Sequence, residues 1–339
     1  MRADFLIVGQ GLAGTLLAWE CERAGFSFAI ADAGHATASS GVAAGIINPI
    51  TGRRLVKSWA IDGRLPVARA AYRELEAALG VPLWREMRVR RIFSDERDRR
   101  VLADKRARGE LGVFAGPATE EGDGFWIECA ARVDLPALLA AARERWRAMG
   151  RLRTGVTDVA AELAQHDLVI DCTGVAGARG GAFGFVPWEY SKGETLTLAV
   201  DGLAPEVILN RGHWVLPVSP GVAWIGATHR PGAIDAVPTA AARDALEASA
   251  RTLLAGRAFA VTGQMAGVRV NLPDKHPVVG RHPAMTRLGL LNGLGSKGAL
   301  HAPALARQWV NHLTEGVPFD AEVDVARFFG CPASQALSP

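Results

Sequence analysis

The feature that most constrains this chain is a run of three glycines close to its N-terminus. An apolar segment from Asp4 to Val8 leads directly into Gly9-Gln10-Gly11-Leu12-Ala13-Gly14, and a second apolar segment, Phe26 to Ala31, ends at Asp32. This order predicts a strand, a glycine turn, a helix, a second strand and an acidic residue, which is the dinucleotide-binding fingerprint of a βαβ unit. An ordinary glycine-rich turn would lack these elements in register. The sequence therefore predicts a nucleotide site.

Each part of the fingerprint has a physical task. Gly9 permits the tight turn, Gly11 lets the backbone approach a pyrophosphate, and Gly14 lets the helix pack closely on the strand. The helix N-terminus offers N–H groups to phosphates, and Asp32 can accept a hydrogen bond from a ribose hydroxyl. Small residues dominate the next segment, 39–45. We expect this segment to bring backbone close to a flat ring or to phosphates, with a flexible loop as the alternative.

Composition narrows the class of protein. The 339 residues, 49% hydrophobic and 22% charged, are typical of one large or two ordinary soluble domains. The net charge is only +3, and acids interrupt the densest basic run, residues 85–108, so we interpret that run as a solvated surface and consider nucleic-acid binding unlikely. Four scattered cysteines predict neither a metal site nor disulfides. The early first strand and the short apolar runs predict no signal peptide, no membrane contact and a cytoplasmic location.

Hydrophobic periodicity predicts an α/β fold with two sheets. The expected elements are a helix over 66–79, a strand pair within 83–93, a strand at 125–127, a helix opened by Val133-Asp134-Leu135-Pro136, a buried strand ending in Asp171-Cys172-Thr173-Gly174, an antiparallel meander over 190–230, a helix over 239–254, and a strand at 288–291 followed by a helix to about 313. We predict a Rossmann-like nucleotide-binding domain (1–60, 130–186, 265–335) interleaved with an antiparallel-sheet domain that binds substrate (61–129, 187–264).

Later motifs occur in an order that matches a known family. They are Lys192-Gly193-Glu194, Trp214-Val215-Leu216-Pro217, Gly226-Ala227-Thr228, Gly267-Val268-Arg269, Pro273-Asp274, Pro277-Val278-Val279-Gly280 and Gly293-Leu294-Gly295-Ser296-Lys297-Gly298. With them, nearly the whole chain resembles the D-amino-acid oxidase (DAO) superfamily of FAD-dependent oxidoreductases. It is most similar to glycine oxidase, sarcosine oxidase and the C-terminal oxidase domain of the bifunctional tRNA wobble-uridine modification enzyme.

The resemblance implies a bound FAD whose AMP half lies on the first βαβ unit. The binding is expected to be non-covalent, because residues 267–280 lack the cysteine that holds the flavin in sarcosine oxidases. The residues that the resemblance places against FAD are Gly9, Gly11, Leu12, Ala13, Gly14, Asp32, Ala33, Ser39, Ser40, Ala44, Gly45, Ile46, Val156, Thr173, Gly174, Gly295, Ser296, Lys297, Gly298, Ala299 and Leu300.

Four residues are the candidates for substrate binding and catalysis. Arg269 resembles the family's carboxylate-binding arginine, since a guanidinium offers two parallel donors. Trp214 occupies the place of a pocket tyrosine in glycine oxidase, which favours a bulkier or less polar substrate. His229 resembles a position facing the flavin's reactive edge, and Lys297 begins a helix that would meet its pyrimidine edge. The alternative interpretations are, in the same order, a surface arginine, a core tryptophan, a solvated histidine and a solvent-facing lysine.

The implied reaction is oxidation of a C–N bond in an amino acid or secondary amine that carries a carboxylate. A hydride passes to flavin N5, the imine hydrolyses, and O2 or another acceptor takes the electrons. Three alternatives remain: removal of a carboxymethyl group from a modified tRNA base, a nicotinamide dehydrogenase, and a non-catalytic flavoprotein. Asn48, Arg53, Arg54 and Lys57 depart from the glycine-oxidase pattern, so they are expected either to add anion-binding groups near the flavin or to face solvent. The sequence does not indicate an oligomeric state.

Overall fold

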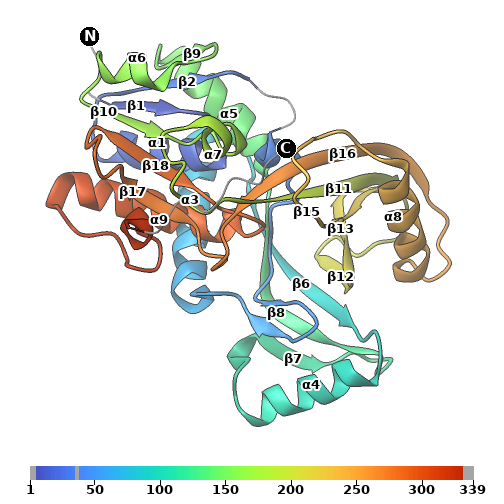
Figure 1. Ribbon diagram of the computed structural model, residues 1–339. Coiled ribbons are helices and arrows are strands. Elements are labelled where there is room, and N and C mark those ends of the chain that lie inside the picture. The colour runs from blue at the N-terminus through green and yellow to red at the C-terminus, as the bar shows by residue number, and fades with distance from the viewer. Residues whose placement is uncertain (1–4, 35–37, 331–339) are drawn as a thin grey trace.

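The computed structural model describes residues 5–34 and 38–330. Two large sheets dominate it, with the first lying beside α1 and α9 and the second extending toward α8 and α4 (Figure 1). The first sheet has the order β17-β18-β10-β1-β2-β9. Five of its strands are parallel and β17 is an antiparallel edge strand. Their bounds are β1 Phe5–Val8, β2 Phe28–Asp32, β9 Leu152–Thr154, β10 Leu168–Asp171, β17 Val278–Arg281 and β18 Leu288–Asn292.

Both faces of this parallel sheet are buried. Ile7, Ile30 and Ile170 belong to one hydrophobic core, whereas the neighbouring Leu6 and Val169 belong to a second core on the opposite face. This explains why the strands have nearly continuous apolar sequences instead of alternating ones. The first core also contains residues of α1 Leu12–Arg23, α3 Ile61–Leu79, α5 Leu135–Ala148 and α9 Gly298–Glu315. The short helices α6 Val159–Leu163 and α7 Val175–Gly180 and the 3₁₀ helix η2 Val325–Phe328 complete this part.

The second sheet has ten strands and is mainly antiparallel. Its path is β15-β11-β14-β13-β12-β6-β8-β3, with β16 paired to β11 and β7 paired to β8. Helix α8 Ala240–Leu253 packs against β11, β12, β13 and β14 through a third hydrophobic core. The strand bounds are β3 Ile46–Ile47, β6 Trp84–Ile92, β7 Ala115–Ala118, β8 Gly124–Val133, β11 Glu189–Ala199, β12 Val207–Arg211, β13 His213–Ser219, β14 Val222–Gly226, β15 Arg230–Pro231 and β16 Ala260–Asn271.

Smaller elements lie between and beside the two sheets. Helix α2 Ser39–Val42 contacts β16, a two-stranded hairpin is formed by β4 Ile50–Thr51 and β5 Val56–Lys57, and α4 Glu96–Ala107 with the 3₁₀ helix η1 Gly112–Phe114 lies beyond β6. The α/β fold with a nucleotide-type parallel sheet and a second antiparallel sheet is confirmed. Strands β8 and β16 run across the predicted boundaries at residues 130 and 265, and the domain division stays a prediction.

Several local predictions were wrong. The helix expected to begin at Pro66 begins at Ile61, and the strand pair expected over 83–93 is the single strand β6. Residues 85–108 are not one solvated surface, because β6 is an interior strand of the sheet and Arg91 is buried there. The prediction failed because the acids and the arginines of this run belong to different elements. Acids such as Asp98 belong to α4, whereas arginines of β6 lie between buried apolar residues of that strand. The helix α4 was not predicted.

Membrane-spanning helices and metal clusters are both absent among the described residues. No helix within 5–34 and 38–330 is long and apolar enough to cross a membrane. Over the same residues, no group of three or more His, Cys, Asp or Glu side chains is arranged to hold a metal ion. The cytoplasmic location stays a prediction.

Candidate active site

Two adjoining cavities lie where the parallel sheet meets the antiparallel sheet. The larger, about 960 Å3, surrounds the first turn of the fingerprint, and the smaller, about 220 Å3, extends from it toward β11, β13 and β16. They share five lining residues, so they form one elongated site. The shared residues are Gly11, Ser39, Ser40, Cys172 and Gly174. A long site of this kind suits a dinucleotide, whose two halves occupy opposite ends.

The glycine turn has the geometry that the fingerprint predicts. Gly9 has φ +97°, and a Cβ atom on Gly14 would lie 1.9 Å from the carbonyl oxygen of Gly9. Gly14 therefore lines neither cavity, and its lack of a side chain lets α1 pack on β1. At the N-terminus of α1, the backbone N–H of Leu12 donates to Ser40 Oγ at 3.0 Å. The seryl side chain thus ties the small-residue segment to the helix start.

Asp32 is held by three donors at the larger cavity. The backbone N–H groups of Gln10 and Gly34 each lie 2.9 Å from its carboxylate, and Arg143 Nη1 lies 2.7 Å from it. Burial opposes ionisation, but these donors outweigh it and lower the pKa of Asp32. Arg143 also donates to Gln10 Oε1 at 2.7 Å. No sequence pattern pointed to Arg143, because it belongs to α5, far along the chain, and only the fold brings it to the fingerprint.

The small-residue segment forms the floor between the two cavities. Ser39 Oγ donates to the carbonyl oxygen of Val268 on β16, and Gly45 has φ +70°. A Cβ atom on Gly45 would lie 1.9 Å from the carbonyl oxygen of Val133, so the backbone passes directly over the end of β8. Ala44 and Ile46 line the smaller cavity from this backbone. The segment is thus fixed at both ends, unlike a flexible loop.

The antiparallel sheet supplies the opposite wall. Thr195, Gly226 and Trp214 are directly paired across β11, β14 and β13. A Cβ atom on Gly226 would lie 2.9 Å from Trp214 Cζ2, so the indole lies across the bare backbone of Gly226. Trp214 lines the cavity as predicted, with Thr195 beside it. The cavity wall is therefore broad and largely apolar at this point.

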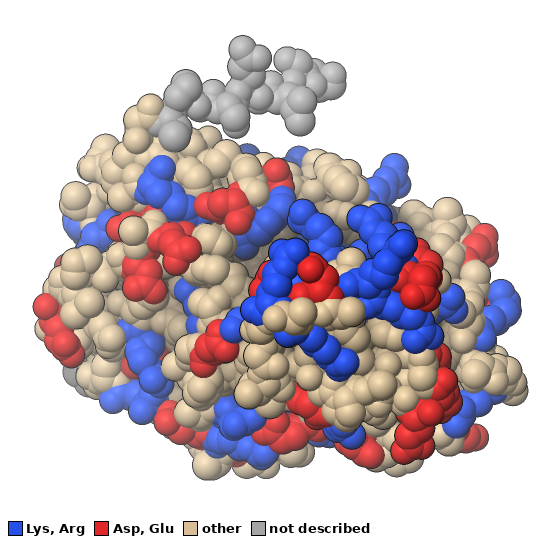
Figure 2. Space-filling view, turned by 90° about the horizontal axis from the view of Figure 1, so that it is seen from below, with Lys and Arg blue, Asp and Glu red and all other residues tan. Residues whose placement is uncertain are grey.

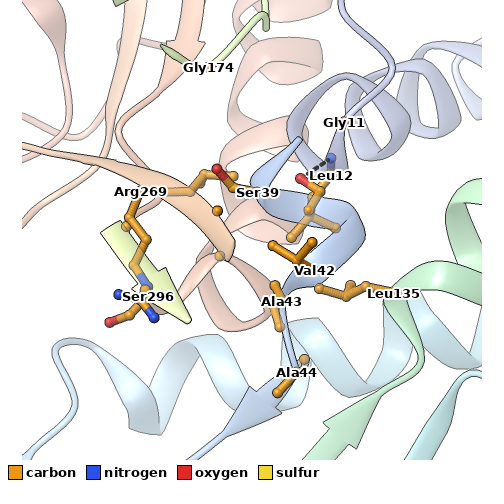
Figure 3. A pocket seen from close by; sticks show the side chains of 18 of the residues that line it. Gly11, Leu12, Ser39, Val42, Ala43, Ala44, Leu135, Gly174, Arg269 and Ser296 are labelled. Atoms are coloured by element: carbon orange, nitrogen blue, oxygen red, sulfur yellow. Dashed lines mark hydrogen bonds between the residues drawn. The ribbon is translucent and has the colours of Figure 1, made fainter. Parts of the chain in front are cut away.

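Arg269 enters the same cavity from β16. Figure 3 shows its side chain on one side of the cavity and those of Leu12, Val42 and Leu135 on the other. Nη1 donates only a long bond, 3.4 Å, to the carbonyl oxygen of Thr228, and none of the described residues offers it a carboxylate within ion-pair distance. Burial lowers the pKa of the guanidinium. A buried cation that faces a cavity without an acidic partner is suited to bind an anionic ligand.

Gly193 explains how the guanidinium fits. A Cβ atom at this position would lie 2.2 Å from Arg269 Nη2, so the side chain of Arg269 crosses the bare backbone of β11. Gly193 was part of a family motif in the sequence, but its role as the support for Arg269 appears only when β11 and β16 pair. Leu135, Ala227 and Asn292 also line the cavity without having been predicted, and Val42 lines it as a member of the predicted segment 39–45.

Most predicted FAD contacts line the two cavities. The smaller cavity includes Gly11, Leu12, Ala13, Ser39, Ser40, Ala44, Gly45, Ile46, Gly174, Gly295, Ser296, Gly298 and Ala299; the larger includes Gly9, Asp32, Ala33, Val156 and Thr173. Leu300 lines neither because it is buried in the core. Lys297 also lines neither; it is the half-buried N-cap residue of α9, and burial lowers its pKa. Their roles stay predictions.

The remaining predicted groups lie outside the cavities. His229 is exposed and lines neither cavity, so the structure does not bring it together with Arg269 and Trp214. Arg53 pairs with Asp95 on the surface, and Lys57 Nζ pairs with Asp62 at 2.6 Å. Arg54 is exposed, and Asn48 accepts a hydrogen bond from the Ile50 N–H at 3.2 Å. These four residues were expected either to bind an anion near the flavin or to face solvent. Their contacts give no support to an anion site beside the cavity.

A buried histidine on α9 makes the stability of the protein depend on pH in a testable way. Arg64 Nη1 lies 3.1 Å from His301 Nδ1, and because arginine can only donate, this nitrogen accepts and the imidazole is neutral. Burial, and then the charges of Arg64, Lys297 and His276, lower the pKa of His301 from 6.5 to about 3. Between these values the unfolded chain binds the additional proton, so the free energy of unfolding falls as the pH drops.

We expect His301→Gln to flatten this dependence. The free energy of unfolding of the unmodified protein should fall by up to about 1.4 kcal/mol per pH unit more than that of the variant between pH 6 and 4. Urea unfolding across this range measures both slopes. The exposed His229→Gln variant is the control and should keep the original slope. Equal slopes for His301→Gln and the unmodified protein would show that His301 takes up its proton in the folded state.

The fold and the two-part cavity are those of a dinucleotide-binding protein in which a separate antiparallel sheet bounds one side of the cavity. Residues 4–311 match the DAO family, described as FAD dependent oxidoreductase. The chain therefore belongs to this family of FAD-dependent oxidoreductases, and the resemblance seen in its motifs is confirmed.

Relatives and solved structures agree with this assignment. The chain is 32% identical over 330 residues to the tRNA 5-methylaminomethyl-2-thiouridine biosynthesis bifunctional protein MnmC of Maricaulis maris (strain MCS10), covering 92% of this chain and 52% of that protein. It is 29% identical over 168 residues to glycine oxidase of Pseudomonas putida, covering 49% of this chain and 46% of that enzyme. The crystal structure of glycine oxidase from Bacillus cereus ATCC 14579 superposes with a TM-score of 0.76 at 19% identity, covering 93% of this chain and 95% of that one. The chain thus spans about half the length of the two relatives matched by sequence.

The residues of the site fit FAD. The larger cavity offers the carboxylate of Asp32 and the start of α1, which suit a ribose and a pyrophosphate. The smaller cavity lies between the small-residue segment and the wall at Trp214, where a ring would lie. FAD as the cofactor is confirmed by the family. Its non-covalent attachment stays a prediction.

Proposed function

We propose that this FAD-dependent oxidoreductase oxidises the C–N bond of an amino acid or secondary amine that carries a carboxylate. The observation that supports this most is Arg269, a buried guanidinium facing the smaller cavity without a carboxylate partner among the described residues. A carboxylate of the substrate would supply the missing charge through two parallel hydrogen bonds. Glycine oxidase, the name of one relative and of a structural neighbour, denotes an enzyme whose substrate has this chemistry.

The other residues orient the substrate. Bound FAD supplies the two-electron acceptor for this oxidation. Arg269 fixes the carboxylate end, and the indole of Trp214 covers the apolar part of the substrate and excludes water from it. Thr195 and Ala227 line the same cavity, and a second substituent on the amine would lie against them. No acid–base pair is required, because an amine that binds in its neutral form needs only orientation for its α-hydrogen to leave as hydride.

Anaerobic bleaching of the flavin tests this proposal. We expect the purified protein to carry FAD and to lose its visible absorption when glycine, sarcosine or another carboxylate-bearing amine is added without oxygen. Readmitting air and measuring hydrogen peroxide then shows whether O2 is the acceptor. Matched amines without the carboxylate, such as methylamine and dimethylamine, should leave the absorption unchanged. Bleaching by the matched amines to the same extent would contradict the role of the carboxylate.

A second candidate is removal of a carboxymethyl group from a modified tRNA base. It is favoured by the relative from Maricaulis maris, a bifunctional protein of tRNA 5-methylaminomethyl-2-thiouridine biosynthesis, of which this chain spans 52%. On the face seen in Figure 2, basic and acidic side chains are interspersed, which gives no separate basic stripe there. We expect binding of bulk tRNA to be weak at physiological salt. Bleaching of the flavin by tRNA that carries the carboxymethyl modification, and not by unmodified tRNA, would favour this candidate.

A further inference from the structure

Two arginines lie side by side within the antiparallel sheet. Arg85 on β6 and Arg132 on β8 are directly paired across the strands, so their side chains leave the same face of the sheet. Arg132 is only 6% exposed and Arg85 is half-buried. Burial lowers the pKa of both guanidiniums, and the charge of Arg132 lowers that of Arg85 further. Two like charges are thus held together in a poorly solvated place, which is costly unless anions balance them.

The charges of this pair are not balanced by the residues around it. Arg132 Nη2 donates to Asp134 Oδ2 at 3.1 Å, and Arg85 Nη2 donates to the neutral carbonyl oxygen of Pro217. Asp134 is also the N-cap of α5 and its side chain is 34% exposed, so solvent weakens its effect. Glu206 acts on Arg85 only from beyond ion-pair distance. One carboxylate therefore serves two guanidiniums.

Each of the two arginines also has a free donor. The Nε atoms of Arg85 and Arg132 are inaccessible to solvent and have no hydrogen-bond partner. Buried N–H groups are almost always paired in folded proteins, so two adjacent exceptions on one face require an explanation. Arg91, on the same strand as Arg85 and also buried, differs in this respect because it donates to Asn210 Oδ1. An arginine buried in this sheet can therefore have a hydrogen-bond partner, as Arg91 does.

Register places the pair on the same face of the sheet as a residue that lines the cavity, although neither arginine lines it. Ile46, which lines the smaller cavity, is paired with Arg132, so Ile46, Arg132 and Arg85 form one row across β3, β8 and β6. On the side of the antiparallel sheet that carries Trp214, the guanidinium of Arg132 lies 5.6 Å from the ring centre of Trp224. Trp224 precedes Gly226 by two residues and shares the face on which the indole of Trp214 lies. The pair therefore lies next to the cavity wall, beyond Trp214.

We propose that Arg85 and Arg132 form a second anion-binding subsite for a carboxylate or phosphate group on the far arm of the amine substrate. This inference rests on the proposed function, in which Arg269 binds the carboxylate beside the bond that is oxidised. An anion beside the two guanidiniums would supply the charge that Asp134 alone does not, and Arg85, which is only half-buried, is the side from which it would approach. The preferred substrate is then a secondary amine with two anionic groups, one on each side of the nitrogen.

Matched substrates test the subsite. Sarcosine and iminodiacetate differ in a second carboxylate, and N-(phosphonomethyl)glycine carries a phosphonate there instead. For Arg85→Met and Arg132→Met holoenzymes, we expect the concentration that half-bleaches the flavin anaerobically to rise roughly ten- to a hundredfold for the preferred dianionic amine. For sarcosine it should change less than twofold. Arg91→Met is the matched control and should leave both values unchanged. Comparing iminodiacetate with N-(phosphonomethyl)glycine shows which anion the subsite prefers.

A second measurement does not depend on the reaction. Inorganic phosphate should raise the melting temperature of the holoenzyme and of Arg91→Met, and should not raise that of either Met variant at Arg85 or Arg132. Equal losses for sarcosine and the dianionic amines, or a phosphate-induced shift that persists in Arg132→Met, would show that the pair only joins strands of the sheet. If no amine bleaches the unmodified enzyme, the proposed function is wrong, and the phosphate shift still decides whether the anion subsite exists.

Discussion

Replacing Arg269 by alanine is expected to raise KM for a carboxylate-bearing amine about a hundredfold, while FAD stays bound. A charge-assisted hydrogen-bonded pair contributes about 3 kcal/mol when it is shielded from solvent, which corresponds to a factor of roughly one hundred. The guanidinium lies in the smaller cavity, away from the held carboxylate of Asp32, so its loss should spare the nucleotide end of the site. Steady-state kinetics and the visible spectrum of the purified variant measure the two effects separately.

Graded variants make this test specific. Arg269→Lys keeps the charge but loses the planar pair of donors, so its KM should lie between those of the unmodified enzyme and Arg269→Ala. Gly193→Ala should raise KM by about tenfold, because the new methyl group would displace the guanidinium that lies 2.2 Å from its position. Arg251→Ala, at a side chain 66% exposed on α8, is the control and should have no effect. An unchanged KM for Arg269→Ala would remove Arg269 from the substrate site.

Replacing Gly14 by alanine is expected to destabilise the fold and abolish stoichiometric FAD binding. The added Cβ would lie 1.9 Å from the carbonyl oxygen of Gly9, a backbone atom that has no side-chain freedom to move away. Helix α1 must then shift away from β1, which we expect to lower the free energy of unfolding by about 3 kcal/mol. The same shift would move the N-terminus of α1 and the loop at Gly11 away from the phosphates. Urea unfolding and the ratio of flavin to protein after gel filtration measure both effects.

Gly63→Ala is the matched control for this substitution. Gly63 lies in the first turn of α3, and a Cβ atom there would meet no other atom within 4 Å. Alanine is a better helix former than glycine, so this variant should be as stable as the unmodified protein or more stable by up to about 1 kcal/mol. Retention of full FAD content and stability by Gly14→Ala would show that the close contact between α1 and β1 is not required.

Local patterns predicted the nucleotide half of the protein well. The positive φ of Gly9, the close contact at Gly14 and the hydrogen bond from Gln10 to Asp32 all arise within one βαβ unit, from residues close together in the sequence. Boundaries were predicted less well where long-range pairing decides them. Strand β8, expected over 125–127, runs from Gly124 to Val133 because it pairs with β6 along most of its length. Propensity within a short window cannot detect such pairing.

The substrate half shows the limit of local reasoning more clearly. Arg269 and Trp214 were predicted from motifs, and both line the cavity. His229 was predicted in the same way, yet its side chain is exposed and it lines neither cavity. Arg85 was assigned to a solvated surface, although it lies within the sheet. Whether a charged side chain faces solvent or a cavity depends on which strand lies beside it.

The sequence by itself determined the family, the cofactor and the glycine turn that holds the nucleotide, since these depend on ordered motifs and on local backbone conformation. Only the tertiary structure decided how Gly193 supports Arg269, which donors hold Asp32, and that Arg85 and Arg132 lie together beside the cavity wall. The physical reason is that these arrangements join residues from distant parts of the chain. Strand register and the burial of charge, which arise only when the sheets assemble, bring them together.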